Sequence, residues 1–448
     1  MTTLISDFSK LMWGPWLLFL LLGTGCWLTI RLRGIQIRSL IYAFRLTFSR
    51  KREGIGEVSH FGALMMALAA TVGMGNIAGV STAVALGGPG AIFWMWLTGF
   101  VGMATKYGEA FLAVKYRKIN IQGKVSGGPM YYLESGLGKK WLGVCFATFG
   151  SLAAFGIGNM IQANTATHAV TESIGGNQFT VGIVLSVLTG LVIVGGVKRI
   201  AEVTSLFVPA MVIIYFFATL IVIFKNLENL SAGISLILGH AFTGTAATGG
   251  FVGSSLAKTI RYGVARGLFS NESGMGSAPI AAAAAKTNHP AKQALVSMTG
   301  TFIDTLIVCS LTAVAITSSG TWVSGETGVV LTIKAFSAGL GEWGAMIVTL
   351  CALTFAFSTI LGWGYYGEKC FEYLFGEKWI NIYRYAWVLF VFIGSVVKLE
   401  VVWNFSDGMN ALMAIPNLIG LIFLSTVLFR ETKAYELGVR DGSIDKFD

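Results

Sequence analysis

The sequence predicts an all-α membrane protein with eleven transmembrane helices: one N-terminal helix followed by a five-plus-five inverted repeat with discontinuous second and seventh helices. Three observations predict this fold class. Only 12% of the residues are charged and 54% are hydrophobic, whereas roughly 25% of the residues of an average soluble protein are charged. Apolar runs of about 18 residues or more, each long enough to cross a bilayer, recur along nearly the whole chain. Two of these runs, one in each half of the chain, are interrupted by glycine-containing sequences.

The chain is predicted to form a single transmembrane domain over residues 1–448. The predicted spans cover residues 13–30, 61–85, 91–113, 142–168, 179–196, 203–224, 251–285, 294–318, 343–373, 382–399 and 408–429. Residues 13–30 form the extra N-terminal helix, residues 61–224 the first repeat and residues 251–429 the second. Each repeat holds five helices, so the second enters the membrane from the opposite side, as an inverted repeat requires. We expect no cleavable signal peptide, because no basic segment precedes the first apolar run.

The net charge of +10 reflects membrane topology and does not indicate a nucleic-acid partner. Most of the 32 Lys and Arg residues fall in loops that the predicted spans place on one side, at residues 31–52, 115–140, 198–199, 286–292, 378–384 and 430–446. Positive charge stays cytoplasmic, which predicts a cell-membrane protein with its N-terminus outside and its C-terminus inside. The basic stretch at residues 31–52 is expected to lie along the inner membrane surface. The five cysteines are dispersed and predict neither a disulfide framework nor a metal site.

The first interruption is the sequence Gly73-Met74-Gly75-Asn76 inside the second span. Unwound backbone at bilayer depth is tolerated only where it faces protein or a watery cavity. A half-helix that starts here would present free N–H groups and a positive dipole end, which suit a carboxylate. Glycines allow a ligand to approach the backbone closely, and the preceding half-helix offers carbonyl oxygens to a small cation. The alternative is a helix that glycine kinks for packing.

The second interruption follows Phe269 in the seventh span and carries Ser270, Asn271, Glu272 and Ser273 before Gly274-Met275-Gly276. An ionisable residue at this depth is costly and usually functional. Glu272 is therefore either a partner for an ammonium group or a structural partner of Arg266. A matched pair of interrupted helices in the two halves of a chain indicates the binding site of a secondary transporter.

Other polar residues inside predicted spans are candidates for the same site. Gln162 in the fourth span could donate to a carboxylate, although interhelical hydrogen bonding is an equally good explanation. Ser358 and Thr359 in the ninth span could bond a ligand or their own backbone, and Thr359 shares a helix face with Trp363. Asp304 in the eighth span has no evident basic partner and could be a cation ligand or a proton site. Metalloprotease, P-loop and nucleophile-elbow motifs are absent from the sequence, so it does not predict an enzyme.

Several longer motifs together resemble one known family. They are GMGNIAG at residues 73–79, GGPGAIFWMW at 87–96, GGPMY at 127–131, FSNE at 269–272, GMGSAP at 274–279, YYGEKC at 365–370 and AIPN at 414–417. In this order and over nearly the whole chain, they resemble the alanine or glycine:cation symporters. The resemblance implies sodium-coupled uptake of small neutral amino acids on the leucine-transporter fold, with one extra N-terminal helix.

The resemblance also implies a site. The substrate carboxylate would be held by Gly73, Met74, Gly75 and Asn76, joined by Gln162, while Phe269 and Met275 would close over the ligand and Trp363 would limit its size. The remaining residues expected to bind substrate are Thr71, Ser270, Asn271, Glu272 and Thr359. The sodium ion would be held by backbone oxygens of Ala69, Val72 and Phe355 and by the hydroxyls of Ser358 and Thr359. Met74 departs from the family pattern, because many relatives carry Thr there.

We therefore expect a Na⁺-driven symporter for alanine or glycine that lies in a lipid bilayer, uses no cofactor besides the coupling ion, and binds no nucleic acid. A monomer is sufficient for this function. Two alternatives remain open. A proton-coupled amino-acid carrier would use Glu272 and Asp304 as titrating groups, and a passive channel or an amino-acid sensor would not accumulate substrate.

Overall fold

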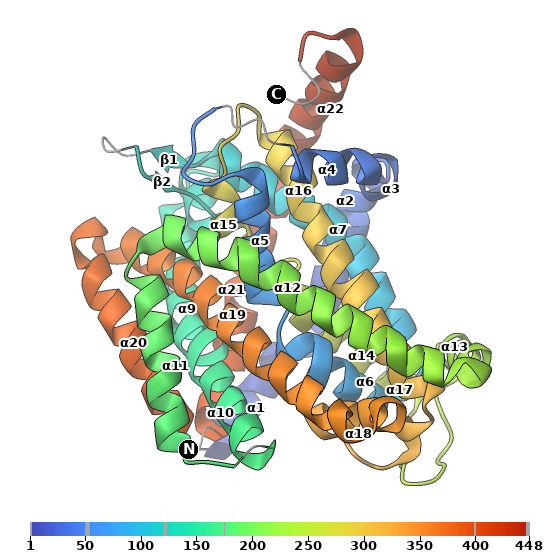
Figure 1. Cartoon of the computed structure of the whole chain (residues 1–448). Coiled ribbons are helices and arrows are strands. Elements are labelled where there is room, and N and C mark those ends of the chain that lie inside the picture. Colours follow the sequence, from blue (N-terminus) through green and yellow to red (C-terminus); the bar gives the residue numbers. More distant parts are fainter. Residues whose placement is uncertain (1, 50–53, 120–122, 174, 398–399, 445–448) are drawn as a thin grey trace.

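The computed structural model describes residues 2–49, 54–119, 123–173, 175–397 and 400–444, and it is a bundle of helices (Figure 1). The described chain holds one two-stranded antiparallel sheet, formed by β1 (Lys118–Ile119) and β2 (Val125–Ser126). The first helix lies at the face of the bundle opposite to the last helix, α22 (Ser425–Asp441) (Figure 1). The sheet lies on the same side as α22 (Figure 1).

The remaining elements are helical throughout. The helices of the first half are α1 (Thr2–Met12), α2 (Pro15–Arg31), α3 (Ile35–Arg38), α4 (Leu40–Thr47), α5 (His60–Thr71), η1 (Gly75–Gly79), α6 (Val80–Gly87), α7 (Ala91–Lys115), α8 (Pro129–Tyr131), η2 (Tyr132–Gly136), α9 (Lys140–Ala153), η3 (Ala154–Met160), α10 (Ile161–Ser173), α11 (Gln178–Ile193) and α12 (Gly196–Lys225). Those of the second half before α22 are η4 (Leu227–Asn229), α13 (Leu230–Gly239), α14 (Leu256–Asn271), α15 (Pro279–Ala283), α16 (Pro290–Thr301), η5 (Phe302–Cys309), α17 (Ser310–Ser318), η6 (Thr321–Val323), α18 (Gly328–Leu340), α19 (Glu342–Phe375), η7 (Glu377–Trp379), α20 (Ile380–Val396) and α21 (Glu400–Phe423).

Among the described residues, six helices are long and apolar enough to cross a membrane. They are Ile5–Arg31, Lys140–Thr171, Gly196–Lys225, Pro290–Ser318, Glu342–Phe375 and Glu377–Val396. Two pairs of consecutive helices are long and apolar enough only when each pair is taken together. They are His60–Thr71 with Gly75–Gly87, bent by 51°, and Val402–Phe423 with Ser425–Asp441, bent by 57°. Counting each pair as one span gives up to eight. The chain is thus a multi-pass membrane protein, and the total of eleven spans stays a prediction.

Both predicted interruptions are present. The second predicted span divides into α5 and the η1–α6 segment, and the seventh divides into α14 and α15. The seventh was expected to begin at residue 251, but α14 begins at Leu256. The hydroxyl of Ser255 accepts a hydrogen bond of 3.4 Å from the N–H of Lys258 and so caps the helix at this point.

Two segments expected to be loops contain helices. These are α13, of 10 residues, and α18, of 13 residues. Both are apolar but shorter than a bilayer crossing requires, so their sequences do not predict transmembrane spans. The two helices pack on α17 and α19 respectively and cover the end of the bundle opposite to α22 (Figure 1).

Candidate functional site

The first break frees backbone groups that a continuous helix would bond. The N–H of Gly73 donates to Oδ1 of Asn76 over 2.9 Å, and the N–H of Asn76 donates to the carbonyl of Gly73 over 3.1 Å. In an uninterrupted helix these two N–H groups would bond the carbonyls of Ala69 and Val72. The N–H groups of Met74 and Gly75 find no acceptor in the described part of the chain. The break therefore leaves two oxygens and two donors for a ligand.

The second break is built from left-handed backbone. Glu272 ends α14 with a φ of 53°, and Gly274 and Gly276 follow with φ of 87° and 83°. Glycine adopts this conformation readily, whereas a non-glycine residue such as Glu272 costs of order 1–3 kcal/mol and is held there by its surroundings. A Cβ at Gly276 would also lie 2.7 Å from the ring of Phe146, so this position requires glycine on two grounds.

Side chains from other helices hold the second break open. The carboxylate of Glu109 in α7 accepts a hydrogen bond of 3.0 Å from the N–H of Gly276. Asn417 in α21 donates to the same carboxylate oxygen over 2.7 Å and to the carbonyl of Gly274 over 2.8 Å. These bonds replace the helical partners that the unwound residues have lost, which is what burial in an apolar bundle demands.

The two breaks face a common small cavity of about 20 Å³, room for about one water molecule. Its lining is Ala70, Thr71, Gly73, Met74, Gly75, Ile157, Gln162, Leu268, Phe269, Glu272, Thr359, Trp363 and Asn410. Nine of the thirteen residues predicted to bind substrate are in this lining. The structure thus brings residues from α5, the fourth predicted span, α14, α19 and α21 to one place.

Four of the predicted residues do not line the cavity. Asn76 and Ser270 turn toward Asp304, and Asn271 accepts a hydrogen bond of 3.0 Å from the N–H of Ser273. Met275 is buried beyond the break. Ala70, Ile157, Leu268 and Asn410 line the cavity but were not predicted. Of these only Asn410 carried a signal in the sequence, as an amide within a predicted span.

Glu272 is a buried carboxylate bound by neutral donors. Its Oε1 accepts a hydrogen bond of 2.9 Å from Nε1 of Trp363, and its Oε2 accepts one of 2.5 Å from the hydroxyl of Ser277. Lys106, also buried, donates to the backbone carbonyl of Glu272 over 3.2 Å. Arg266 forms no ion pair with Glu272; its guanidinium lies over the ring of Phe269 instead, 5.8 Å from the centroid. The sequence-based alternative of an Arg266–Glu272 pair is therefore wrong.

Two side-chain amides at the cavity have open acceptors. Nε2 of Gln162 donates to the carbonyl of Ile157 over 3.1 Å, so its Oε1 is buried without a partner in the described chain. Oδ1 of Asn410 is also buried without a described partner. Buried polar atoms in proteins are generally bonded. Together with the Glu272 carboxylate, these oxygens give the cavity an acceptor-rich lining suited to an ammonium group.

Trp363 limits the space available to a side chain. Its ring lies at the cavity and is fully buried, and its side chain packs so closely on α9–α10 that a Cβ at Gly158 would overlap it. The indole is thus fixed from one side by Gly158 and from the other by its bond to Glu272. Because interiors are packed near crystal density, the cavity must widen for any amino acid, and a large side chain beside the indole requires more widening than a small one.

The five residues predicted to hold sodium are all buried where α5 meets α19. The hydroxyls of Ser358 and Thr359 both donate to the carbonyl of Phe355, each over 2.9 Å. The Thr359 hydroxyl lies close to the backbone of Gly73 in the first break, because a Cβ built on Gly73 would be only 2.7 Å from Oγ1 of Thr359. The carbonyls of Ala69 and Val72, which the break frees from their helical partners, belong to the same end of α5. This oxygen-only set suits a hard monovalent cation, because carbonyl and hydroxyl oxygens can replace its hydration shell.

Asp304 ties the two breaks together. Its carboxylate accepts hydrogen bonds from Nδ2 of Asn76 over 2.8 Å, from the hydroxyl of Ser270 over 2.9 Å and from that of Thr305 over 2.7 Å. Asn76 belongs to the first break and Ser270 to the end of α14. The carboxylate is fully buried and holds the two discontinuous helices at a fixed separation.

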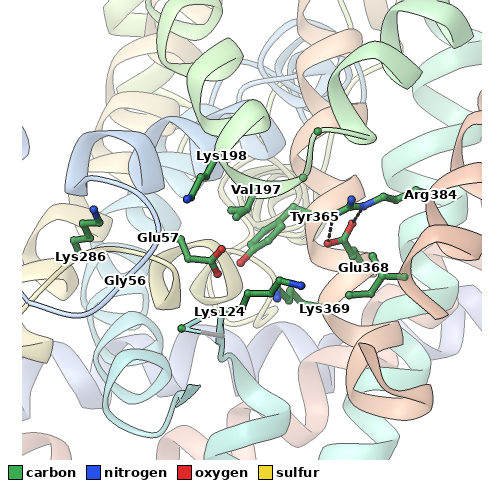
Figure 2. A pocket seen from close by; sticks show the side chains of 14 residues that line it. Gly56, Glu57, Lys124, Val197, Lys198, Lys286, Tyr365, Glu368, Lys369 and Arg384 are labelled. Carbon is green, nitrogen blue, oxygen red and sulfur yellow. Dashed lines mark hydrogen bonds and ion pairs between the residues drawn. The ribbon is translucent and has the colours of Figure 1, made fainter. Parts of the chain in front are cut away.

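A larger cavity of about 500 Å³ lies between the segment before α5, the start of α12 and the second half of α19. Figure 2 shows the side chains of Glu57, Lys198 and Tyr365 gathered around it, with Arg384 bound to Glu368 at its edge. The ion pair between Arg384 and Glu368 measures 2.6 Å. The cavity lies on the side of the bundle where the basic loops and α22 are found. Tyr365, which lines it, is two residues after Trp363 in α19.

A backbone latch borders this larger cavity. We use this name for residues 55–58 before α5, residues 283–287 from the last residue of α15 onward, and Arg117. Glu57 donates its N–H to the carbonyl of Ala284 over 2.7 Å, and Lys286 donates its N–H to the carbonyl of Val58 over 2.7 Å. The guanidinium of Arg117 donates to four carbonyls, namely those of Ile55 at 2.6 Å, Ala283 at 2.9 Å, Ala285 at 2.8 Å and Thr287 at 3.3 Å. The latch joins the outer ends of both discontinuous helices.

Comparisons with known proteins agree with this architecture. The family model described as the sodium:alanine symporter family matches residues 1–448. The sodium/alanine symporter AgcS of Methanococcus maripaludis is 51% identical over 443 residues, with 97% of each chain covered. The probable sodium/glutamine symporter GlnT of Bacillus subtilis is 39% identical, with 95% of this chain and 89% of GlnT covered. The crystal structure of MhsT in complex with L-phenylalanine has a TM-score of 0.61 at 14% identity, covers 83% of this chain and 89% of MhsT, and shows a shared fold.

Proposed function

The chain belongs to the sodium:alanine symporter family of sodium-coupled amino-acid symporters, and we propose that it couples inward Na⁺ movement to the uptake of alanine and glycine. One observation carries the choice of small substrates. The cavity between the two breaks is closed by Trp363, which Gly158 and Glu272 hold in place. A pocket that excludes by overlap discriminates sharply against large side chains, whereas one missing methylene is worth only about 1–3 kcal/mol. Alanine and glycine should therefore both be accepted.

In this proposal the two ends of the amino acid face opposite walls. The carboxylate lies against the free N–H groups of Met74 and Gly75 at the start of η1, where the helix dipole favours negative charge. The ammonium faces the oxygens of Gln162, Asn410 and Glu272. Sequence reasoning assigned Gln162 to the carboxylate. Its engaged amide nitrogen supports the ammonium side instead.

Sodium would bind about one helical turn away from the substrate carboxylate. Its ligands would be the freed carbonyls of Ala69 and Val72 and the hydroxyls of Ser358 and Thr359. The ion then bridges α5 to α19 at the break that also holds the carboxylate. Each ligand stabilises the arrangement that the other requires, and this coupling free energy is what makes transport stoichiometric. Rocking of the discontinuous helices against the other helices would expose the site to each side in turn.

We infer the orientation of the protein in the membrane from the distribution of its Lys and Arg residues. The loops on the side of α22 carry most of the Lys and Arg residues, and positive charge stays cytoplasmic. We place α22 and the larger cavity of Figure 2 on the cytoplasmic side. That cavity would then be the route by which substrate and ion leave.

A proton-coupled carrier is the second candidate, because Glu272 and Asp304 are two buried carboxylates close to the site. Their donors are neutral hydroxyl, amide and indole groups, and these satisfy the carboxylates without a bound cation. This observation favours a structural role for Asp304, leaves Glu272 to face the ammonium group of the substrate, and favours sodium as the coupling ion.

The deciding experiment is uptake of radiolabelled alanine into proteoliposomes that contain the purified protein. Concentrative uptake should require an inward sodium gradient and should stop when choline replaces sodium. Uptake that follows an imposed pH gradient without sodium would establish the proton-coupled alternative. Equilibration without accumulation would indicate a channel, and the absence of counterflow would indicate a sensor.

A further inference from the structure

A basic groove lies at the edge of the bundle, away from the candidate transport site. It has a volume of about 370 Å³ and lies between the turn that joins α2 to α3 and one face of α22. We define the basic groove by its lining residues, which are Ile30, Arg31, Leu32, Arg33, Arg38, Phe429, Thr432, Lys433 and Glu436. Four of these side chains are cationic and one is anionic.

Most of this positive charge is not neutralised. Arg38 is paired with Glu436 over 3.0 Å and also donates to the carbonyls of Arg33 and Leu32. Within the described chain, no carboxylate lies within ion-pair distance of Arg31, Arg33 or Lys433. The net charge of the groove is therefore strongly positive, and the single acid is already engaged.

Arg31, one of the three cations without an acidic partner, is held in place by aromatic rings. The guanidinium of Arg31 lies over the rings of Phe429 and Trp27, 4.4 Å and 5.2 Å from their centroids. Such contacts orient the guanidinium and leave its N–H edge free for an acceptor. Arg33 adopts a φ of 52°, a conformation that non-glycine residues rarely adopt. Backbone strain of this kind concentrates at ligand-binding sites.

The groove borders the end of a helix that is long and apolar enough to cross a membrane. Arg31 is the last residue of the apolar helix Ile5–Arg31, so it lies where that span leaves the hydrocarbon. Ile30 beside it is 73% exposed and Trp27 is 44% exposed, as expected for side chains in contact with acyl chains. Basic pockets at the cytoplasmic ends of membrane helices suit the headgroups of anionic lipids.

We propose that the basic groove binds the phosphate group of an anionic phospholipid of the cytoplasmic leaflet. The phosphate oxygens accept hydrogen bonds from Arg31 and Arg33, and Lys433 closes the site from α22. The acyl chains lie along Ile30 and Trp27. The bound lipid thereby joins the N-terminal helix to the C-terminal helix, two elements outside the candidate transport site.

The test uses the full-length protein in nanodiscs of phosphatidylcholine with a minor fraction of phosphatidylglycerol, followed by native mass spectrometry of the lipids that stay bound. The wild type should retain phosphatidylglycerol in preference to phosphatidylcholine. The triple variant Arg31→Gln, Arg33→Gln and Lys433→Gln should lose this preference, with affinity falling about fivefold for each charge removed. A matched triple variant, Lys139→Gln, Lys140→Gln and Arg430→Gln, removes the same charge outside the groove and should retain the lipid.

Equal retention by the groove variant and the matched variant would overturn the proposal. Displacement of the lipid by millimolar inorganic phosphate, with tight binding of phosphate itself, would also overturn it, because the ligand would then be a soluble phosphate. If the groove triple variant does not fold, the single variant Lys433→Gln gives the same comparison against Arg430→Gln on the same helix. Alanine uptake is not the readout, so the result is independent of the proposed transport function.

Discussion

The indole N–H of Trp363 donates a 2.9 Å hydrogen bond to the carboxylate of Glu272, so the residue that limits the cavity is bound to the residue that ends α14. The second carboxylate oxygen of Glu272 is bound by Ser277 on the far side of the break. The indole cannot swing away without leaving a buried oxygen unpaired, which costs about 1–3 kcal/mol. The size limit of the cavity is therefore coupled to the geometry of the second break.

Replacing Trp363 with Ala should admit larger substrates. The truncation removes the indole from the cavity, and we expect valine or leucine to become inhibitors of alanine uptake, with weaker binding of alanine itself. Loss of a buried Trp should cost about 3–5 kcal/mol of stability, so thermal unfolding is measured in parallel. Trp363→Phe is the matched control, because it keeps most of the volume and removes only the N–H. If the substrate range of Trp363→Ala is unaltered, the cavity is not the substrate site.

Replacing Thr359 with Ala should weaken activation by sodium. The hydroxyl of Thr359 lies against the backbone of Gly73 at the break, and its removal takes one oxygen from the proposed ion site. A lost ligand worth about 1–1.5 kcal/mol would raise the half-saturating sodium concentration about tenfold. Thr359→Ser retains the hydroxyl and should behave nearly as the wild type. Sodium activation that is the same in all three proteins would exclude this ion site.

Replacing Asn410 with Ala should raise the KM for alanine and leave sodium activation unchanged when it is measured at saturating alanine. Its amide oxygen is buried at the cavity without a described partner, whereas the proposed ion site lies between α5 and α19. We expect an increase of tenfold or more, because a hydrogen bond to a charged group is worth about 1.5–3 kcal/mol. Gln162→Ala should act in the same direction. A change in sodium activation with an unchanged KM would mean that Asn410 does not contact the substrate.

The breaks could be predicted because their signal is local. Four consecutive residues at Gly73–Asn76 and a run of polar residues after Phe269 cannot form a lipid-facing helix, whatever surrounds them. The helices α13 and α18 could not be predicted in this way, because they are too short for a span and have no other distinguishing pattern. Their helical state depends on packing against α17 and α19, which is a tertiary effect.

The site was predicted less completely than the fold, because spacing places a residue near a break without fixing where its side chain points. Asn76 and Ser270 sit within the two breaks but turn toward Asp304, away from the cavity. Asn410 reaches the cavity from α21, about 140 residues from Glu272 in sequence. Only the packing of α21 beside the fourth predicted span brings it there.

Replacing Arg117 with Gln should loosen the latch between the two discontinuous helices. The guanidinium spans four carbonyls that belong to both flanks, and Gln offers one amide group in its place. Hydrogen bonds to charged groups are worth about 1.5–3 kcal/mol, so local opening should become tenfold or more frequent. Hydrogen exchange should accelerate at the N–H groups of Glu57, Val58 and Lys286, which bond across the latch.

Two control variants make this result specific. Arg117→Lys keeps the charge but provides a compact ammonium with three donors, which cannot span four carbonyls, so its exchange should be intermediate. Arg199→Gln removes an exposed charge near the same face and should leave exchange in residues 55–58 and 283–287 unchanged. If Arg117→Gln also leaves these segments protected, the backbone hydrogen bonds hold the flanks together without the arginine. If hydrogen exchange accelerates and the KM for sodium also rises, the closed latch stabilises the sodium-binding arrangement of α5. The reason is that an ion that binds the closed state best binds less tightly overall when the closed state is less populated.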